Sequence, residues 1–323
     1  MGLITSPSEG SAAPSPRPLG LPRWYAHPYN RPGYYRLALA AAPRLPRRLR
    51  RWVATGAVRV LRHGFPAERA AVRRNLARVH PGRDAAWLDG AVQRLFENFG
   101  VCFADLLSLN RGPAHRLWRH VAGVSGQEHA DAALAAGGSG AIFITAHLGN
   151  WQLAGRLLGV FGRRVHVVMA PEQDPGLADL LGGGPDGGVR FVRRESPLIS
   201  VKLVGALRRG DIVAFQVDRA TGQRGDCRVP FFGAPAPFPL GPFVLAAAAG
   251  VPVLPAFCIL EPRGDYRLYV EPAFAVTRGE EERGLARAVA LLEGYVAAHA
   301  EQWFNFFDVW DDAGGASGAI AGG

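Results

Sequence analysis

The sequence is poor in cysteine and in long apolar runs, and each shortage excludes a class of protein. Only 3 of its 323 residues are cysteine, which is too few for a disulfide framework. The 41 glycines follow no three-residue period and no heptad repeat persists, so collagen and coiled coils are excluded. With 48% hydrophobic residues, the chain suits one large or two modest domains with a real core.

A transmembrane helix needs about 20 uninterrupted apolar residues, and the sequence contains no such run. The one comparable window, Val229–Leu260, contains seven prolines, which would leave broken backbone in lipid. We expect a loop there, then a short buried helix over Phe243–Ala249 that stops at Gly250, then a buried strand through Val251–Leu260. Residues 1–20 lack the apolar stretch of a signal peptide, which predicts a protein that stays in the cytoplasm.

Positive charge is concentrated at the start of the chain. Residues 1–80 hold 15 arginines and 2 glutamates, a net charge of +13, whereas the other 243 residues sum to −3. Between Tyr34 and Leu61, arginines alternate with apolar residues such as Trp52, a pattern typical of a helix lying on an anionic membrane surface. Pro43 and Pro46 must break or kink that helix.

Two other interpretations of this basic segment are open. One is a solvated basic helix that packs on the rest of the protein. The other is nucleic-acid binding, which is disfavoured because no aromatic platform or zinc-ligand spacing accompanies the charge. We therefore expect an anionic membrane surface, and no nucleic acid, as the partner of this segment.

The pattern of the chain changes near residue 120. Before that point we expect helices, the clearest over Ala67–Arg78 and Asp84–Leu107. Beyond it, short apolar runs alternate with amphipathic stretches, which predicts an α/β fold whose sheet contains parallel strands. The expected strands are Ala141–Thr145, Val165–Met169, Val189–Val192, Ile212–Val217 and Val251–Leu260, and the expected helices are Trp151–Phe161, Leu198–Leu207 and Glu281–His299.

These patterns divide the chain into four parts. We expect residues 1–22 to be a disordered tail and residues 23–120 to be a basic helical region that associates with a membrane. We expect residues 121–312 to form the α/β core and residues 313–323, rich in Gly and Ala, to be a second disordered tail.

In an α/β sheet, chemistry gathers at the carboxyl ends of the strands. His147 follows the strand Ala141–Thr145 and precedes a helix, whose positive end disfavours protonation of the imidazole. A neutral histidine at this place is suited to be a general base, although a histidine before a helix, taken alone, is more often structural. Gly149 allows close approach of the backbone, and Asn150 can cap the helix.

The run His147-Leu148-Gly149-Asn150-Trp151, followed by a polar residue, resembles the signature block of the bacterial lysophospholipid acyltransferase superfamily. The resemblance is strongest to its lipid A biosynthesis (lauroyl/myristoyl) acyltransferase branch. Further blocks resemble that branch in the same order, over roughly residues 35–310. They are Arg73–Leu76, Phe96–Asn98, Asp218–Arg219, Val229–Gly233, Phe238–Pro242, Val251–Val253 and Gln302–Phe307.

The resemblance implies an acyltransferase-like mixed sheet flanked by helices. It also implies transfer of a fatty acyl chain from an acyl carrier protein or CoA thioester to a hydroxyl, or an amine, of a lipid or glycolipid acceptor. His147 would be the general base, and Asn150, Trp151 and Arg219 would contact substrate. The expected location is the cytoplasmic face of a bacterial inner membrane, with peripheral attachment. No metal or bound cofactor is expected, because the thioester supplies the activation.

Gln152 departs from the family pattern, which has an acidic residue five positions after the histidine. A carboxylate there would orient the imidazole and stabilise the imidazolium, whereas an amide gives orientation without charge. Three explanations follow: Asp218, after the strand Ile212–Val217, supplies the carboxylate; a slower enzyme uses Gln152; or the chain is a catalytically impaired, lipid-binding relative. A strand-end aspartate such as Asp218 is also compatible with a structural role beside Arg219.

Overall fold

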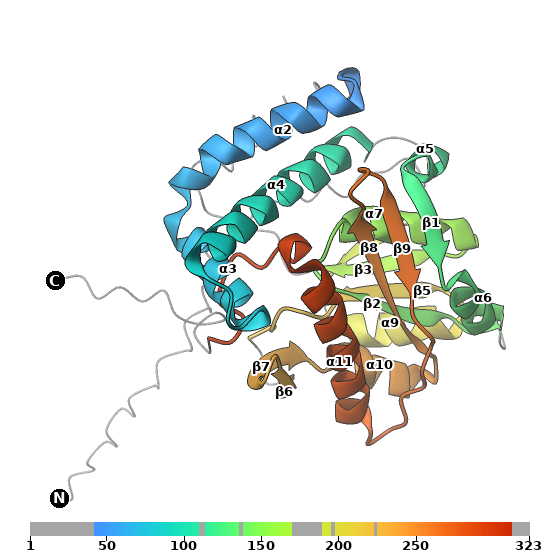
Figure 1. Cartoon of the computed structure of the whole chain (residues 1–323). Coiled ribbons are helices and arrows are strands. Elements are labelled where there is room, and N and C mark those ends of the chain that lie inside the picture. The colour runs from blue at the N-terminus through green and yellow to red at the C-terminus, as the bar shows by residue number, and fades with distance from the viewer. Residues whose placement is uncertain are drawn as a thin grey trace, which may run out of the picture.

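Residues 42–109, 114–135, 138–169, 189–194, 198–222 and 225–311 are described by the structure, a computed structural model (Figure 1). The predicted disordered tails, 1–22 and 313–323, lie outside the described residues. So does the start of the predicted basic helix, up to residue 41.

A mixed sheet of seven strands forms the centre of the fold. Its members in chain order are β1 (Val121–Ser125), β2 (Ala141–Thr145), β3 (Val165–Met169), β4 (Val189–Arg193), β5 (Ile212–Gln216), β8 (Val253–Leu260) and β9 (Tyr266–Val270). Their order across the sheet is β1-β9-β8-β2-β5-β3-β4. The strands β8, β2, β5, β3 and β4 are parallel, whereas β9 is antiparallel to β8 and β1 is parallel to β9. The predicted α/β fold with parallel strands is confirmed.

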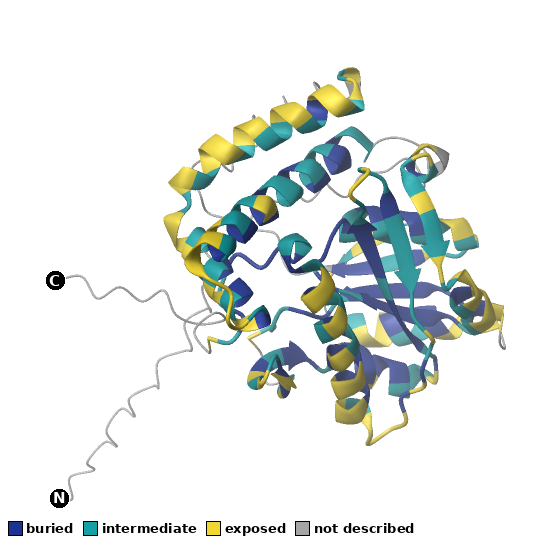
Figure 2. Cartoon of the chain, viewed as in Figure 1, coloured by how far each residue is buried: buried dark blue, intermediate teal, exposed yellow. Residues whose placement is uncertain are grey.

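Helices cover both faces of this sheet, which is why β2 and β5 each bury four residues in a row (Figure 2). The helix α6 (Gln127–Ala135) packs on one face. The other face is covered by α9 (Ile199–Arg208), α10 (Gly241–Ala249) and α11 (Glu281–His299). Gly250 ends α10 in the left-handed conformation, with φ of 69°, as predicted from the sequence.

The helix predicted over Trp151–Phe161 is divided in two. The α-helical part, α7, covers Trp151–Leu157, and a 3-10 turn, η5, continues it over Leu158–Phe161. Tightening of the last turn supplies partners for carbonyl groups that the end of an α-helix leaves unpaired.

The loop expected after Val229 is wrong, because a β-hairpin occupies that place. Its strands are β6 (Asp226–Phe231) and β7 (Ala234–Pro239), joined by Phe232 and Gly233. Both turn residues have positive φ, 48° and 75°, which is the geometry of a two-residue hairpin turn. The prolines that indicated a loop are tolerated because a two-stranded hairpin consists only of edge strands.

Helices precede the sheet, as predicted. They are η2 (Ala42–Arg44), α2 (Arg47–Leu61), η3 (Arg62–Gly64), α3 (Pro66–Val79), α4 (Ala85–Leu109) and α5 (Ala114–Trp118). The helix α2 begins directly after Pro46 and packs along α4. Gly100 permits this contact, since a Cβ there would lie 2.7 Å from Cγ2 of Val58. In the described part of the chain, no helix combines the length and the apolar character needed to cross a membrane.

Candidate active site

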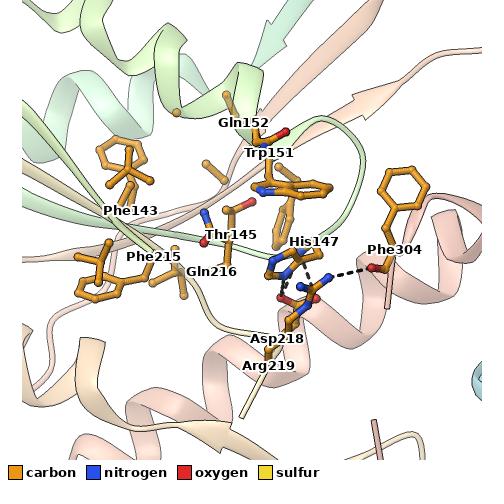
Figure 3. Close-up of a pocket in the computed structure, with 18 of the residues that line it drawn as sticks. Phe143, Thr145, His147, Trp151, Gln152, Phe215, Gln216, Asp218, Arg219 and Phe304 are labelled. Atoms are coloured by element: carbon orange, nitrogen blue, oxygen red, sulfur yellow. Dashed lines mark hydrogen bonds and ion pairs between the residues drawn. The ribbon is translucent and has the colours of Figure 1, made fainter. Parts of the chain in front are cut away.

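His147 and Asp218 meet just beyond the carboxyl ends of two neighbouring parallel strands. The last residues of β2 and β5, Thr145 and Gln216, are register partners, so the chains leave the sheet side by side. Nδ1 of His147 lies 2.8 Å from Oδ1 of Asp218, and the backbone N–H of His147 donates to both carboxylate oxygens at 3.0 Å (Figure 3). Of the two residues considered as orienters of the imidazole, Asp218 is therefore the one in contact with it.

Donors from the C-terminal segment complete the surroundings of Asp218. Its side chain is fully buried, and Oδ2 accepts from Nε1 of Trp303 at 3.0 Å and from Nδ2 of Asn305 at 2.9 Å. The segment is fixed beside His147, because the N–H of Phe304 donates to the carbonyl of His147 at 2.7 Å. An ionised carboxylate only accepts hydrogen bonds, so Nδ1 of His147 carries the proton and Nε2 is left as an acceptor.

The charges of the pair follow from this environment. Burial lowers the pKa of His147, and the charge of Arg219 lowers it further. Together these two effects outweigh the opposing effect of Asp218, which raises the pKa. For Asp218, burial favours the protonated form, but the hydrogen bonds from His147 and the charge of Arg219 hold its pKa well below the usual range. At neutral pH the pair is therefore a neutral imidazole beside a carboxylate.

Arg219 connects the strand end to the C-terminal segment. Its Nε donates to Oδ1 of Asn305 at 2.8 Å, and its Nη2 donates to the carbonyl of Phe304 at 2.9 Å. The guanidinium also lies over the ring of Phe307, 5.7 Å from its centre, and lines the cavity described next. Arg219 thereby orients the same amide group of Asn305 that donates to Asp218.

A cavity of about 2060 Å³ opens beside His147. Its lining is mainly apolar and comes from several layers of the fold: Val53 of α2, Phe99 and Phe103 of α4, and Phe143 and Val167 of the sheet all contribute. This volume exceeds the roughly 300–1,000 Å³ of a usual small-molecule pocket. The cavity has the size and lining needed for long hydrocarbon chains.

Trp151 and Gln152, in the first turn of α7, both line this cavity. The ring of Trp151 lies 4.9 Å from the imidazole of His147, measured between ring centres. Gln152 is different, since no hydrogen bond joins its side chain to His147 or to any other described residue. Figure 3 places it on the far side of Trp151 from Asp218.

Asn150 is buried and has hydrogen bonds only within the protein. Its Oδ1 accepts from the backbone N–H of Leu153 at 3.2 Å, which confirms the predicted helix cap. Its Nδ2 donates to the carbonyl of Cys102 and to the hydroxyl of Tyr266, each at 3.2 Å. Asn150 is not among the residues that line the cavity. Gly149 has φ of 59°, and a Cβ there would lie 2.0 Å from the carbonyl oxygen of Cys258.

The sequence alone gave no role to the groups that hold Asp218 and Asn150 in place. Trp303 and Asn305, which donate to Asp218, are part of a C-terminal block, and Tyr266, which contacts Asn150, carries no motif. An amide and an indole N–H in a buried aromatic segment are a weak signal, because only the fold shows that they converge on one carboxylate.

Known proteins match this chain over most of its length. The model of the bacterial lipid A biosynthesis acyltransferase family matches residues 34–311. Phosphatidylinositol mannoside acyltransferases from two strains of Mycobacterium tuberculosis are each 32% identical, over 272 and 275 residues, which is 79% of this chain and 80% of the relatives' length. The 1-acyl-sn-glycerophosphate acyltransferase PlsC from Thermotoga maritima, a solved structure, matches with 17% identity and a TM-score of 0.34, over 77% of this chain and 98% of that chain.

The match to the family model spans nearly all described residues, and the resemblance inferred from the ordered sequence blocks is confirmed. The relatives named above are acyltransferases. The chain therefore belongs to the bacterial lipid A biosynthesis acyltransferase family and is an acyltransferase.

Proposed function

We propose that this acyltransferase moves a fatty acyl chain from a thioester donor to a hydroxyl group of a glycolipid, with His147 as the general base. One observation carries the proposal: Asp218 holds Nδ1 of His147, and Nε2 is left without a partner among the described residues, beside a large apolar cavity. A base that is neutral, oriented and adjacent to an acyl-sized cavity suits attack by a hydroxyl on a thioester.

The proposed reaction has two steps. Nε2 of His147 takes the proton of the acceptor hydroxyl while its oxygen attacks the thioester carbonyl carbon, and a tetrahedral intermediate forms. Collapse of this intermediate breaks the carbon–sulfur bond, and the imidazolium returns the proton to the leaving thiolate. Asp218 stabilises the imidazolium between these steps. The thioester supplies the activation, so the reaction as proposed needs no metal or bound cofactor.

The other predicted site residues receive separate roles in this proposal. Trp151 contacts substrate beside the base. Asn150 positions α7 through its cap and does not contact substrate. Arg219 favours the neutral form of His147 and anchors Asn305, in addition to its predicted contact with substrate. Gln152 contacts substrate in the cavity and does not orient the imidazole.

The proposed acceptor is a phosphatidylinositol mannoside or a related glycolipid, because the two relatives are named for that acceptor. The donor is an acyl carrier protein or CoA thioester. The proposed location is the cytoplasmic face of an inner membrane, with α2 against the anionic lipid surface. Trp52 and Val60 of α2 support this placement, since they are 75% and 72% exposed.

The alternative of a catalytically impaired, lipid-binding relative depended on Gln152. Asp218 provides a carboxylate at the imidazole, so replacement of the acidic residue at position 152 leaves the site with its carboxylate. We therefore propose an active enzyme.

The test is acyl transfer by the purified protein in mixed lipid micelles. Labelled acyl carrier protein and acyl-CoA donors would each be offered with phosphatidylinositol mannosides or with a bacterial lipid extract. The expected result is a labelled acylated glycolipid from wild type and none from His147→Ala. Absence of product with every donor and acceptor, from wild type that binds labelled lipid, would support the lipid-binding alternative.

A further inference from the structure

A buried chain of hydrogen bonds connects α2 to the catalytic loop. Asp105 of α4 is its centre, with a side chain that is 0% exposed. Nη2 of Arg50 donates to Oδ1 of Asp105 at 3.0 Å, and Nε of Arg51 donates to Oδ2 at 3.2 Å. The hydroxyl of Tyr266, on β9, donates to Oδ2 at 3.0 Å and accepts from Nδ2 of Asn150 at 3.2 Å.

The direction of every hydrogen bond in this chain is fixed. Oδ1 of Asn150 accepts from the N–H of Leu153, so Nδ2 of Asn150 faces Tyr266 and must donate. The Tyr266 oxygen therefore accepts from Asn150 and sends its own proton to Asp105. Burial opposes ionisation of Asp105, but hydrogen bonds from Arg51 and Arg50 and the charges of Arg51 and Arg47 lower its pKa, so it is an acceptor.

The two ends of this chain both belong to the active site. At one end, Arg50 belongs to α2, which forms a wall of the cavity through residues such as Val53 and Leu61. At the other end, Asn150 caps α7, the helix that carries Trp151 and follows His147 by four residues. A shift of α2 would thus change the position of Asp105 and of the Tyr266 hydroxyl, which accepts the hydrogen bond from the Asn150 amide.

We propose that Tyr266 is a positioning residue for acyl transfer. Its hydroxyl connects Asp105, which binds the arginines of α2, to the side chain of Asn150, which caps α7. This inference rests on the proposed function only for its effect on rate. Its effect on the structure of α7 is independent of the acceptor and of the donor.

Tyr266→Phe tests the relay with little change in shape, and Tyr295→Phe is the matched control. Tyr295 also donates its hydroxyl to a carboxylate, Glu271, at 2.6 Å, and neither tyrosine lines the cavity, but only Tyr266 of the two is hydrogen-bonded to Asn150. We expect Tyr266→Phe to lower kcat on the order of tenfold, with the KM of the thioester unchanged. Tyr295→Phe should leave kcat at the wild-type value, at a temperature where both variants are folded.

A double-mutant cycle with Asn150→Ala separates a relay from general destabilisation. If Tyr266 acts through Asn150, the double variant loses no more kcat than the more damaging single variant. Additive losses in kcat would overturn the proposal.

Hydrogen–deuterium exchange gives a readout that does not need activity. Tyr266→Phe should raise exchange in peptides covering 151–157 and leave 47–61 protected, whereas Asp105→Asn should raise exchange in both. Unchanged exchange in 151–157 for Tyr266→Phe would overturn the relay. If the wild type shows no acyl transfer but Tyr266→Phe still raises exchange in 151–157, the relay is supported and the proposed function is refuted.

Discussion

Two histidine–aspartate pairs lie at opposite ends of the same sheet. His147 and Asp218 are 2.8 Å apart at the carboxyl ends of the strands, and His166 and Asp211 are 3.0 Å apart near the amino ends of β3 and β5. The two imidazole side chains are equally exposed, at 14%. Contact distance and burial therefore do not distinguish a catalytic pair from a structural one.

The surroundings of the two pairs differ. Asp211 lies near two guanidiniums, with Arg164 and Arg209 at 3.6 and 4.0 Å, and His166 is absent from the cavity lining. Asp218 receives neutral donors from Trp303 and Asn305, and His147 lines the cavity. Two pairs with the same contact and the same imidazole exposure therefore differ in access to the cavity and in whether neutral donors or guanidiniums surround the carboxylate.

The largest expected effect separates the two histidines directly. His147→Ala should lower kcat/KM for acyl transfer by about 10⁴-fold, the upper end of what general-base catalysis contributes. His166→Ala should leave kcat/KM within about twofold, because its imidazole does not reach the cavity. Steady-state rates with the same thioester donor give both values, and equal losses in the two variants would erase the distinction.

Matched amide substitutions test the two carboxylates. Asp218→Asn should lower kcat by about 10³-fold or more, because an amide in this place favours the wrong tautomer of His147. Asp211→Asn should change stability but not kcat per folded molecule. Thermal unfolding and single-turnover rates measure the two effects, and a kcat loss confined to Asp211→Asn would contradict the account.

The pH profile reports the charge environment of His147. Because burial and Arg219 lower its pKa, the acid limb of kcat/KM should lie below about pH 6.5, the ordinary value for histidine. Arg219→Gln removes one of the groups that lower this pKa, so the limb should move to higher pH. His166→Ala should leave the limb where it is. A limb in the Arg219 variant that moves to lower pH would reverse the assigned sign.

Gln152→Glu has the smallest expected effect. Since Asp218 already holds the imidazole, a new carboxylate at position 152 should change kcat by less than about threefold, which corresponds to less than about 1 kcal/mol. A rise of tenfold or more in kcat would show that position 152 orients His147, as the family pattern implies. Gln152→Met, which has a similar length and no charge, is the control for shape.

The sequence predicted the strands and the meeting of His147 with Asp218 better than it predicted the groups that surround this contact. Central strands such as Ala141–Thr145 begin with four apolar residues because these are covered on both faces, and that signal is local. His147 and Asp218 could be found because parallel strands bring their carboxyl ends together.

The groups that hold Asp218 and Asn150 in place could not be found in the same way, because their contacts join segments that are distant in the sequence. Asn305 and Asp218 are separated by 87 positions, and Tyr266 and Asp105 by 161. The hairpin over 226–239 was missed for another reason: prolines indicate a loop unless the strand is known to be an edge.

The tautomer and charge of His147 are the most direct test of the central claim. Long-range proton–nitrogen NMR correlations of the histidine rings, assigned with His147→Ala, report both. The account predicts a ring protonated at Nδ1 and free at Nε2 at pH 7, which takes its second proton only below about pH 6.5. A His147 ring that is doubly protonated at pH 7, or that carries its single proton on Nε2, would contradict its assignment as the base held by Asp218.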